Sequence, residues 1–170
     1  MSGQQNISFL KRKSRAAGLA FEEMIKASCK FYEAMGEAKI DKTPEPTMPI
    51  RALGKGQFLT YFVKKAQPDF KGVIKGGQAV VFEAKHTDTD KMSRSKISYE
   101  QEKELDAYEQ MGAECYVLVS FGFRKFYKFP WKYFRDMDWY LGRKHIKETD
   151  FEIKEYEIKY INGVLRFLYQ

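Results

Sequence analysis

Two stretches decide the fold: PDFKGVI at residues 68–74 and AVVFEAK at residues 79–85. Both are rich in residues that favour strands, and the glycine-containing segment 75–77 between them predicts a β-hairpin. A two-glycine turn would point Asp69 and Glu83 to opposite faces of the sheet. A three-residue loop places Asp69 directly across from Glu83 on one face, and its glycines supply the left-handed conformation that such a loop needs.

The facing carboxylates predict a metal site. Directly opposed side chains lie roughly 5 Å apart at Cβ, and two carboxylates at that separation repel each other unless a cation intervenes. Mg²⁺ or Mn²⁺ would meet that need and would activate water for phosphodiester hydrolysis. Lys85 and Thr87 project on the same face, since strand side chains repeat every second residue. The alternative is a surface Glu-Lys pair beside an unrelated acid, a pattern that chance often produces.

Composition favours an anionic partner. The 170 residues carry 30 Lys and Arg against 23 Asp and Glu, a net charge of +7, which suits nucleic acid but also serves solubility alone. We expect no membrane association and a cytoplasmic location, because no apolar run is long enough to span a bilayer and no apolar signal segment is present. Cys29 and Cys115 are expected to be free thiols, and two histidines are too few for a zinc site.

The N-terminal part divides into an arm and a helix. Residues 1–15 are polar and basic and are expected to form a flexible arm, or simply a solvated terminus. Residues 16–34 show apolar positions at helical spacing. Glu22 lies at the edge of that apolar stripe, whereas Glu23 lies on the opposite, solvent-exposed face of the helix. Residues 16–170 are expected to form a single domain.

The segment from Lys42 to about residue 65 has a different character. It opens with three prolines, which exclude a helix or a central strand. Basic residues alternate with aromatic ones in its remainder, as suits contact with a nucleic-acid backbone and exposed bases. The alternative is an extended excursion that packs its aromatics on the domain or on a second subunit. The expected DNA contacts are Lys42, Arg51, Lys55, Lys64, Lys65, Lys71 and Thr87.

The C-terminal half predicts a mixed α/β domain. Residues 86–96 are polar and expected to be mobile, and a helix is expected over 98–111, stopped by Gly112. Its inward stripe would hold Ile97, Gln101, Leu105, Tyr108 and Met111. Ser98 and Gln101 also fit a capping box, so capping and active-site roles for Gln101 both stay open. Strands are expected at 116–119 and 123–129, a helix or loop at 130–141, and partial strand alternation at 151–168.

Five ordered blocks resemble the RecU family, the Holliday junction resolvases of Gram-positive bacteria and their phages. The resemblance covers about residues 15–135. The blocks are Gly18-x-x-Phe21-Glu22-x-x-Ile25 with Phe31-Tyr32; Lys42-Thr43-Pro44-x-Pro46; Asp69-Phe70-x-Gly72-x-x-x-Gly76; Phe82-Glu83-Ala84-Lys85-x-Thr87; and Gln101.

The resemblance implies a restriction-endonuclease-like PD-(D/E)XK fold, with a mixed central sheet flanked by helices. It also implies a stalk at about residues 44–66 that enters the centre of a four-way junction. It implies a homodimer that nicks opposed strands, and metal-binding and catalytic positions at Glu22, Asp69, Glu83 and Lys85, with Gln101 and Thr87 in support. Recombinases or branch-migration motors become candidate partners, and a nucleoid-associated location follows.

Departures from the family pattern bear on substrate preference. Pro68 stands where the family usually has a hydroxyl residue, Glu100 stands where it often has histidine, and the stalk is shorter than in the cellular enzymes, which suggests a phage or divergent member. Two alternatives therefore stay open. The same fold could serve a restriction or repair nuclease, or the protein could be a DNA-binding recombination modulator without nuclease activity.

Overall fold

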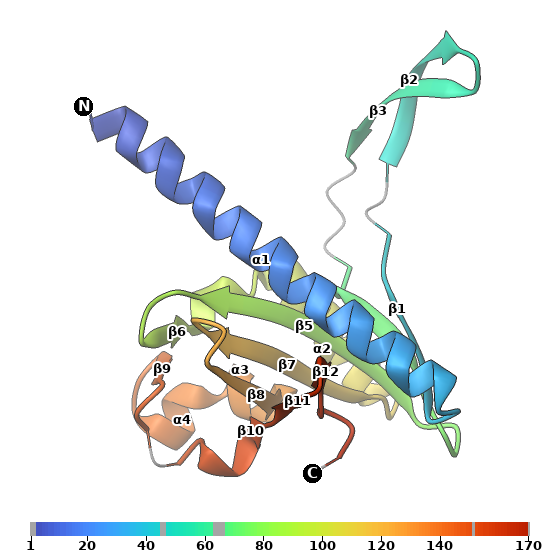
Figure 1. Cartoon of the computed structure of the whole chain (residues 1–170). Coiled ribbons are helices and arrows are strands. Elements are labelled where there is room, and N and C mark those ends of the chain that lie inside the picture. Colours follow the sequence, from blue (N-terminus) through green and yellow to red (C-terminus); the bar gives the residue numbers. More distant parts are fainter. Residues whose placement is uncertain (1–2, 45–46, 63–66, 151, 170) are drawn as a thin grey trace.

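A six-stranded mixed sheet forms the centre of the computed structural model, which describes residues 3–44, 47–62, 67–150 and 152–169 (Figure 1). The strand order is β1-β4-β5-β7-β8-β10, and only the β5–β7 pair is parallel. The expected mixed α/β architecture is therefore confirmed. The strands are β1 (Ala38–Lys42), β4 (Phe70–Ile74), β5 (Ala79–Thr87), β7 (Glu114–Phe121), β8 (Lys125–Pro130) and β10 (Glu157–Ile158).

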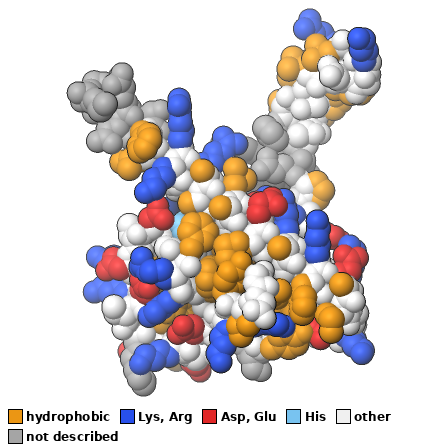
Figure 2. All heavy atoms as spheres, in the orientation of Figure 1, with side chains coloured by type: hydrophobic (Ala, Val, Ile, Leu, Met, Phe, Trp, Pro, Cys, Tyr) orange, Lys and Arg blue, Asp and Glu red, His pale blue; other side chains and the backbone are white. Residues whose placement is uncertain are grey.

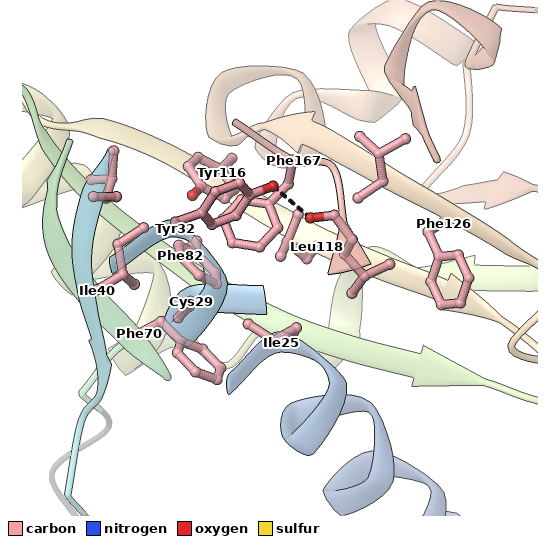
Figure 3. Packing of buried hydrophobic residues seen from close by; sticks show 14 of the residues in the cluster. Ile25, Cys29, Tyr32, Ile40, Phe70, Phe82, Tyr116, Leu118, Phe126 and Phe167 are labelled. Carbon is pink, nitrogen blue, oxygen red and sulfur yellow. Dashed lines mark hydrogen bonds between the residues drawn. The ribbon is translucent and has the colours of Figure 1, made fainter. Parts of the chain in front are cut away.

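Helix α1 (Gly3–Ala34) packs across one face of the sheet. The expected stripe is confirmed, since Phe21, Ile25 and Tyr32 are fully buried against side chains of β4, β5 and β7 (Figure 3). The helix begins at Gly3 instead of near Ala16, so the segment expected to be a flexible arm is helical. No proline interrupts this segment, and its Gln, Leu, Lys, Arg and Ala residues favour helix. From Phe9 to Ala16 its side chains are exposed.

Three further helices cover the opposite face: α2 (Tyr99–Gln110), α3 (Trp131–Arg135) and α4 (Met137–Leu141). They enclose a second apolar cluster with Val81, Val117 and Val119. Because neighbouring residues of β5 and β7 face opposite ways, these two strands are buried on both sides, as their unbroken apolar runs predict. The C-terminal end of α2 differs from expectation, because Met111 is 86% exposed at the cap instead of facing inward.

The segment expected to be mobile, residues 86–96, is regular. Strand β5 continues to Thr87, strand β6 (Lys91–Ser93) pairs with β9 (His145–Lys147), and a short 3₁₀ helix η1 (Arg94–Lys96) leads into α2. Met92 is completely buried opposite Ile146. A single buried apolar residue in a polar stretch anchors this ribbon, and periodicity over so short a segment cannot reveal it.

The β4–β5 hairpin has the three-residue loop that the sequence predicts. Phe70 pairs with Phe82, and the Ile74 N–H donates to the Gln78 carbonyl at 3.0 Å. Gly76 and Gly77 both have positive φ. The other edge of β4 depends on Gly72, because a Cβ there would lie 2.2 Å from the Lys39 carbonyl oxygen of β1. Strand β1 therefore packs closely only against a glycine.

Strands β2 (Thr47–Gly54) and β3 (Gln57–Phe62) form a separate antiparallel hairpin, which with its flanking residues corresponds to the expected stalk. It projects from the same side of the molecule as the N-terminal half of α1 (Figure 1). The side chains from Thr47 to Tyr61 are exposed, including large apolar ones. Figure 2 shows Lys and Arg side chains near its tip and along the projecting part of α1. Lys64 and Lys65 lie outside the described residues.

The C-terminal segment closes the α1 face of the core. After a short 3₁₀ helix η2 (Lys154–Tyr156), strands β11 (Tyr160–Ile161) and β12 (Val164–Leu165) pair with each other. The Tyr32 hydroxyl donates to the Leu165 carbonyl at 2.6 Å, a bond drawn in Figure 3, and the Leu165 N–H donates to Ser28 Oγ at 2.9 Å. These two bonds satisfy the polar groups of β12 on a face that is otherwise apolar.

Candidate active site

The β4–β5 hairpin brings Asp69 and Glu83 together with Lys85. The observed register, continued by one residue, places Asp69 opposite Glu83. Lys85 Nζ donates to Glu83 Oε2 at 2.6 Å and lies 3.7 Å from Asp69 Oδ2. The Ala84 N–H donates to the same Asp69 oxygen at 2.9 Å. The side chains are therefore held by the hairpin itself, with one oxygen of each carboxylate already engaged.

Burial dominates the electrostatics of Glu83. Its side chain has no exposed surface, and loss of solvation raises its pKa to about 8. The Lys85 ammonium opposes this rise, whereas the negative charge of Asp69 adds to it. An ionised Glu83 is thus unfavourable in the protein alone, as expected where a further cation belongs.

Burial and nearby charges also act on the pKa of Lys85, in opposite directions. Burial lowers its pKa, but attraction to Glu83, then Asp69 and then Glu22 outweighs burial and raises the pKa overall. The side chain is 17% exposed. Lys85 therefore remains a fixed positive charge beside the two acids.

Gln101 reaches this centre from the first turn of α2. Its Nε2 donates to Glu83 Oε2 at 2.7 Å, while its Oε1 and backbone N–H complete a capping box with Ser98. Gln101 therefore completes the capping box of α2 and also contacts Glu83.

Glu22 and Lys42 form a separate pair beside the centre. The Lys42 ammonium donates to the Glu22 carboxylate, and both side chains are mostly buried between α1 and the end of β1. Glu22 is near enough to Lys85 to contribute to its charge environment. The structure does not place Glu22 in direct contact with Asp69 or Glu83. Lys42, which the sequence analysis expects to contact DNA, is paired with this carboxylate.

The residues fit a divalent cation in one specific respect. Glu83 Oε1 is buried and makes no hydrogen bond with any described residue, although Oε2 accepts two. A buried carboxylate oxygen without a donor is costly unless a cation or water meets it. Within residues 3–44, 47–62, 67–150 and 152–169, no three acidic, histidine or cysteine side chains converge. Mg²⁺ is commonly held by one or two carboxylates, with waters and substrate phosphates completing its shell.

The remaining expected DNA contacts lie in different surroundings. Lys71 Nζ donates to the Tyr108 hydroxyl at 2.9 Å, on the same sheet face as Asp69. The Thr87 hydroxyl shares a hydrogen bond with Thr89 at the end of β5. Arg51 and Lys55 are exposed on the β2–β3 hairpin.

Sequence reasoning missed two contributors to the site. The Ala84 backbone N–H cannot be recognised from residue type, because every non-proline residue offers one. Tyr108 lay on the expected inward stripe of α2, about two turns beyond Gln101. That stripe was the available signal for its contact with Lys71.

The chain matches the family model described as "RecU: Recombination protein U" over residues 16–169. The chain belongs to the RecU family. Among curated relatives of this RecU family member is the "Holliday junction resolvase RecU" of Streptococcus sanguinis, 30% identical over 123 residues. That alignment covers 68% of the present chain and 61% of the relative, so it spans less than two thirds of the relative's length.

A solved structure that aligns with this chain is that of Archaeoglobus fulgidus Hjc, described as a Holliday junction resolvase from an archaeal hyperthermophile. It is 18% identical, with a TM-score of 0.47, over 78% of this chain and 89% of that one. This similarity is too low to identify corresponding residues. Within its described residues, the RecU family member has no helix long and apolar enough to cross a membrane.

Proposed function

We propose that this protein is a structure-selective endonuclease that resolves four-way DNA junctions by hydrolysis dependent on Mg²⁺ or Mn²⁺. One observation supports this most strongly: Asp69 and Glu83 face each other beside Lys85, and a buried oxygen of Glu83 lacks a donor. The core would be restriction-endonuclease-like, and the protein would act on DNA in the cytoplasm, at the nucleoid. Membership of the RecU family supports the choice of substrate.

Each residue of the centre has a distinct part in this proposal. Asp69 and Glu83 would hold the ion, with Glu83 contributing Oε1. A bound divalent ion lowers the pKa of a water ligand and polarises a phosphate oxygen. Lys85 would offset the negative charge of the acids and would stabilise charge that develops on the scissile phosphate. Gln101 fixes Glu83, and Glu22 would join the centre through a water molecule or after it parts from Lys42.

The stalk would select the branched substrate. The expected stalk ends at about residue 66, only a few positions before Asp69 in the sequence. Contact of the stalk with the open centre of a junction would therefore bring a nearby phosphate to the acids. Arg51 and Lys55 would contact backbone, and the exposed Phe58 and Tyr61 would stack on unpaired bases.

We further propose a homodimer, because resolution of a junction requires two symmetric cuts and a two-fold axis supplies two equivalent centres. Recombinases and branch-migration motors would be its partners during recombination and repair.

The test is cleavage of a labelled synthetic junction, compared with linear duplex of the same sequence, in Mg²⁺ and in EDTA. The wild type should cut only the junction, symmetrically, and only with metal. Asp69→Asn and Glu83→Gln should bind the junction but not cut it. Equal cleavage of linear duplex would favour a restriction or repair nuclease. Full activity in both variants, or absence of cutting by the wild type at any metal concentration, would contradict the proposal.

A further inference from the structure

The side-chain amide of Gln101 is held at both ends. Its Oε1 accepts from the Ser98 backbone N–H at 3.1 Å, and its Nε2 donates to Glu83 Oε2 at 2.7 Å. The Ser98 hydroxyl makes a different bond, accepting from the Gln101 backbone N–H at 3.2 Å. Ser98 thus contacts Gln101 twice, once through its main chain and once through its side chain.

The Ser98 N–H determines which end of the amide faces Glu83. A backbone N–H can only donate, so it requires the oxygen of the Gln101 amide. In the ionised form that would bind a cation, the Glu83 carboxylate can only accept, so the NH₂ group is directed to it. Both ends therefore require the same orientation, and one rotamer of Gln101 meets both.

The orientation of the Gln101 amide affects both oxygens of the Glu83 carboxylate. Oε2 accepts from both Lys85 and Gln101, which together hold this oxygen, and the buried Oε1 has no donor among the described residues. Partners that orient a metal-ligating carboxylate are ordinarily important to ion affinity. If Gln101 turned away, Lys85 alone would hold Glu83, and the carboxylate would be free to rotate.

We propose that the Ser98 main-chain N–H is a positioning group for the metal centre, acting through Gln101 on Glu83. This inference rests on the proposed metal dependence of the same centre. Ser98 is itself exposed and makes no hydrogen bond or ion pair with Asp69, Glu83 or Lys85. Any effect on ion binding must therefore pass through the first turn of α2.

The chain offers a substitution that isolates this N–H. Ser98 has φ −73° and ψ 162°, and the preceding Ile97 has φ −96° and ψ 122°, values that proline and a residue before proline adopt. Ser98→Pro removes the N–H and the hydroxyl, whereas Ser98→Ala removes only the hydroxyl. Both variants lose the cap, so each should melt about 2–4 °C below the wild type. Ala107→Gly, at an exposed position of α2, weakens the helix without touching Ser98 or Gln101.

The experiment is calorimetric titration of Mn²⁺ into each protein without DNA. Ser98→Pro should bind Mn²⁺ about 10-fold more weakly than Ser98→Ala, the lower end of the range for outer partners of a metal ligand. Ala107→Gly should bind as the wild type does. In a Gln101→Met background, Ser98→Pro should have no further effect, because its route to Glu83 is already removed.

The outcomes separate the two proposals. Equal Mn²⁺ affinity of Ser98→Pro and Ser98→Ala, or an undiminished effect of Ser98→Pro in the Gln101→Met background, would overturn the positioning role while leaving the metal centre intact. Failure of the wild type to bind Mn²⁺ would overturn both. If Ala107→Gly weakened binding as strongly as Ser98→Pro, general loosening of α2 would replace the specific contact.

Discussion

Removing the charge of Glu83 should stabilise the metal-free protein at alkaline pH. Glu83 is fully buried, with a pKa of about 8 against an ordinary value of 4.5. Each unit of that separation corresponds to roughly 1.4 kcal/mol, so ionising Glu83 costs the folded state up to about 5 kcal/mol. Because the folded pKa is the higher one, the folded state binds more protons between pH 4.5 and 8. The free energy of unfolding should therefore fall as pH rises through this window.

Glu83→Gln removes this titration and keeps the shape of the side chain. In EDTA, urea unfolding at pH 5 and pH 8.5 should show that the variant gains several kcal/mol on the wild type between the two pH values. Glu104→Gln, at an exposed position of α2, is the matched control and should follow the wild type. A constant difference between Glu83→Gln and wild type across the window would refute the argument that burial opposes ionisation of Glu83.

Three further predictions concern packing and DNA contact. Gly72→Ala would place a Cβ 2.2 Å from the Lys39 carbonyl oxygen and should cost about 1–3 kcal/mol or more in urea unfolding, whereas Gly18→Ala, with no heavy atom within 4 Å, should be neutral or stabilising; equal effects would contradict the close β1–β4 approach. Tyr32→Phe leaves the Leu165 carbonyl without its donor and should cost about 1–3 kcal/mol, while Tyr99→Phe, on a side chain 64% exposed in its native form, should cost little; a stable Tyr32→Phe protein would show that the C-terminal segment is held otherwise. Arg51→Ala and Lys55→Ala should each lower the slope of log junction affinity against log salt by about 1, as the loss of one phosphate contact does, with Lys154→Ala as the comparison; unchanged slopes would remove the stalk from the DNA interface.

The hairpin could be predicted from the sequence because the requirement is local, and the register with Asp69 opposite Glu83 followed from the three-residue loop, one of the two loops considered. Two apolar runs, a glycine-containing loop and the two-residue period of strands fix which side chains face each other, and Asp69 opposite Glu83 follows. The apolar stripe of α1 and the capping box of α2 were accessible for the same reason. These patterns depend on neighbours along the chain.

The features that the sequence did not reveal depend on partners distant along the chain. Strand β1 exists because Gly72 admits its close approach, and β6 is ordered because Met92 finds Ile146 more than fifty residues later. Lys42 and Lys71 read as free cations in the sequence, but the fold supplies Glu22 and Tyr108 as their partners. The residues of the N-terminal segment have high helix propensity, and the segment is helical. Its clustered basic residues had suggested a flexible arm instead.

The most direct test of the metal centre is anomalous diffraction from crystals of the protein grown with Mn²⁺. We predict an anomalous peak within bonding distance of an Asp69 carboxylate oxygen and of Glu83 Oε1, with Glu83 Oε2 still held by Lys85 and Gln101. A fully occupied Mn²⁺ elsewhere on the chain, with Glu83 Oε1 bound to no ion at saturating Mn²⁺, would contradict the account.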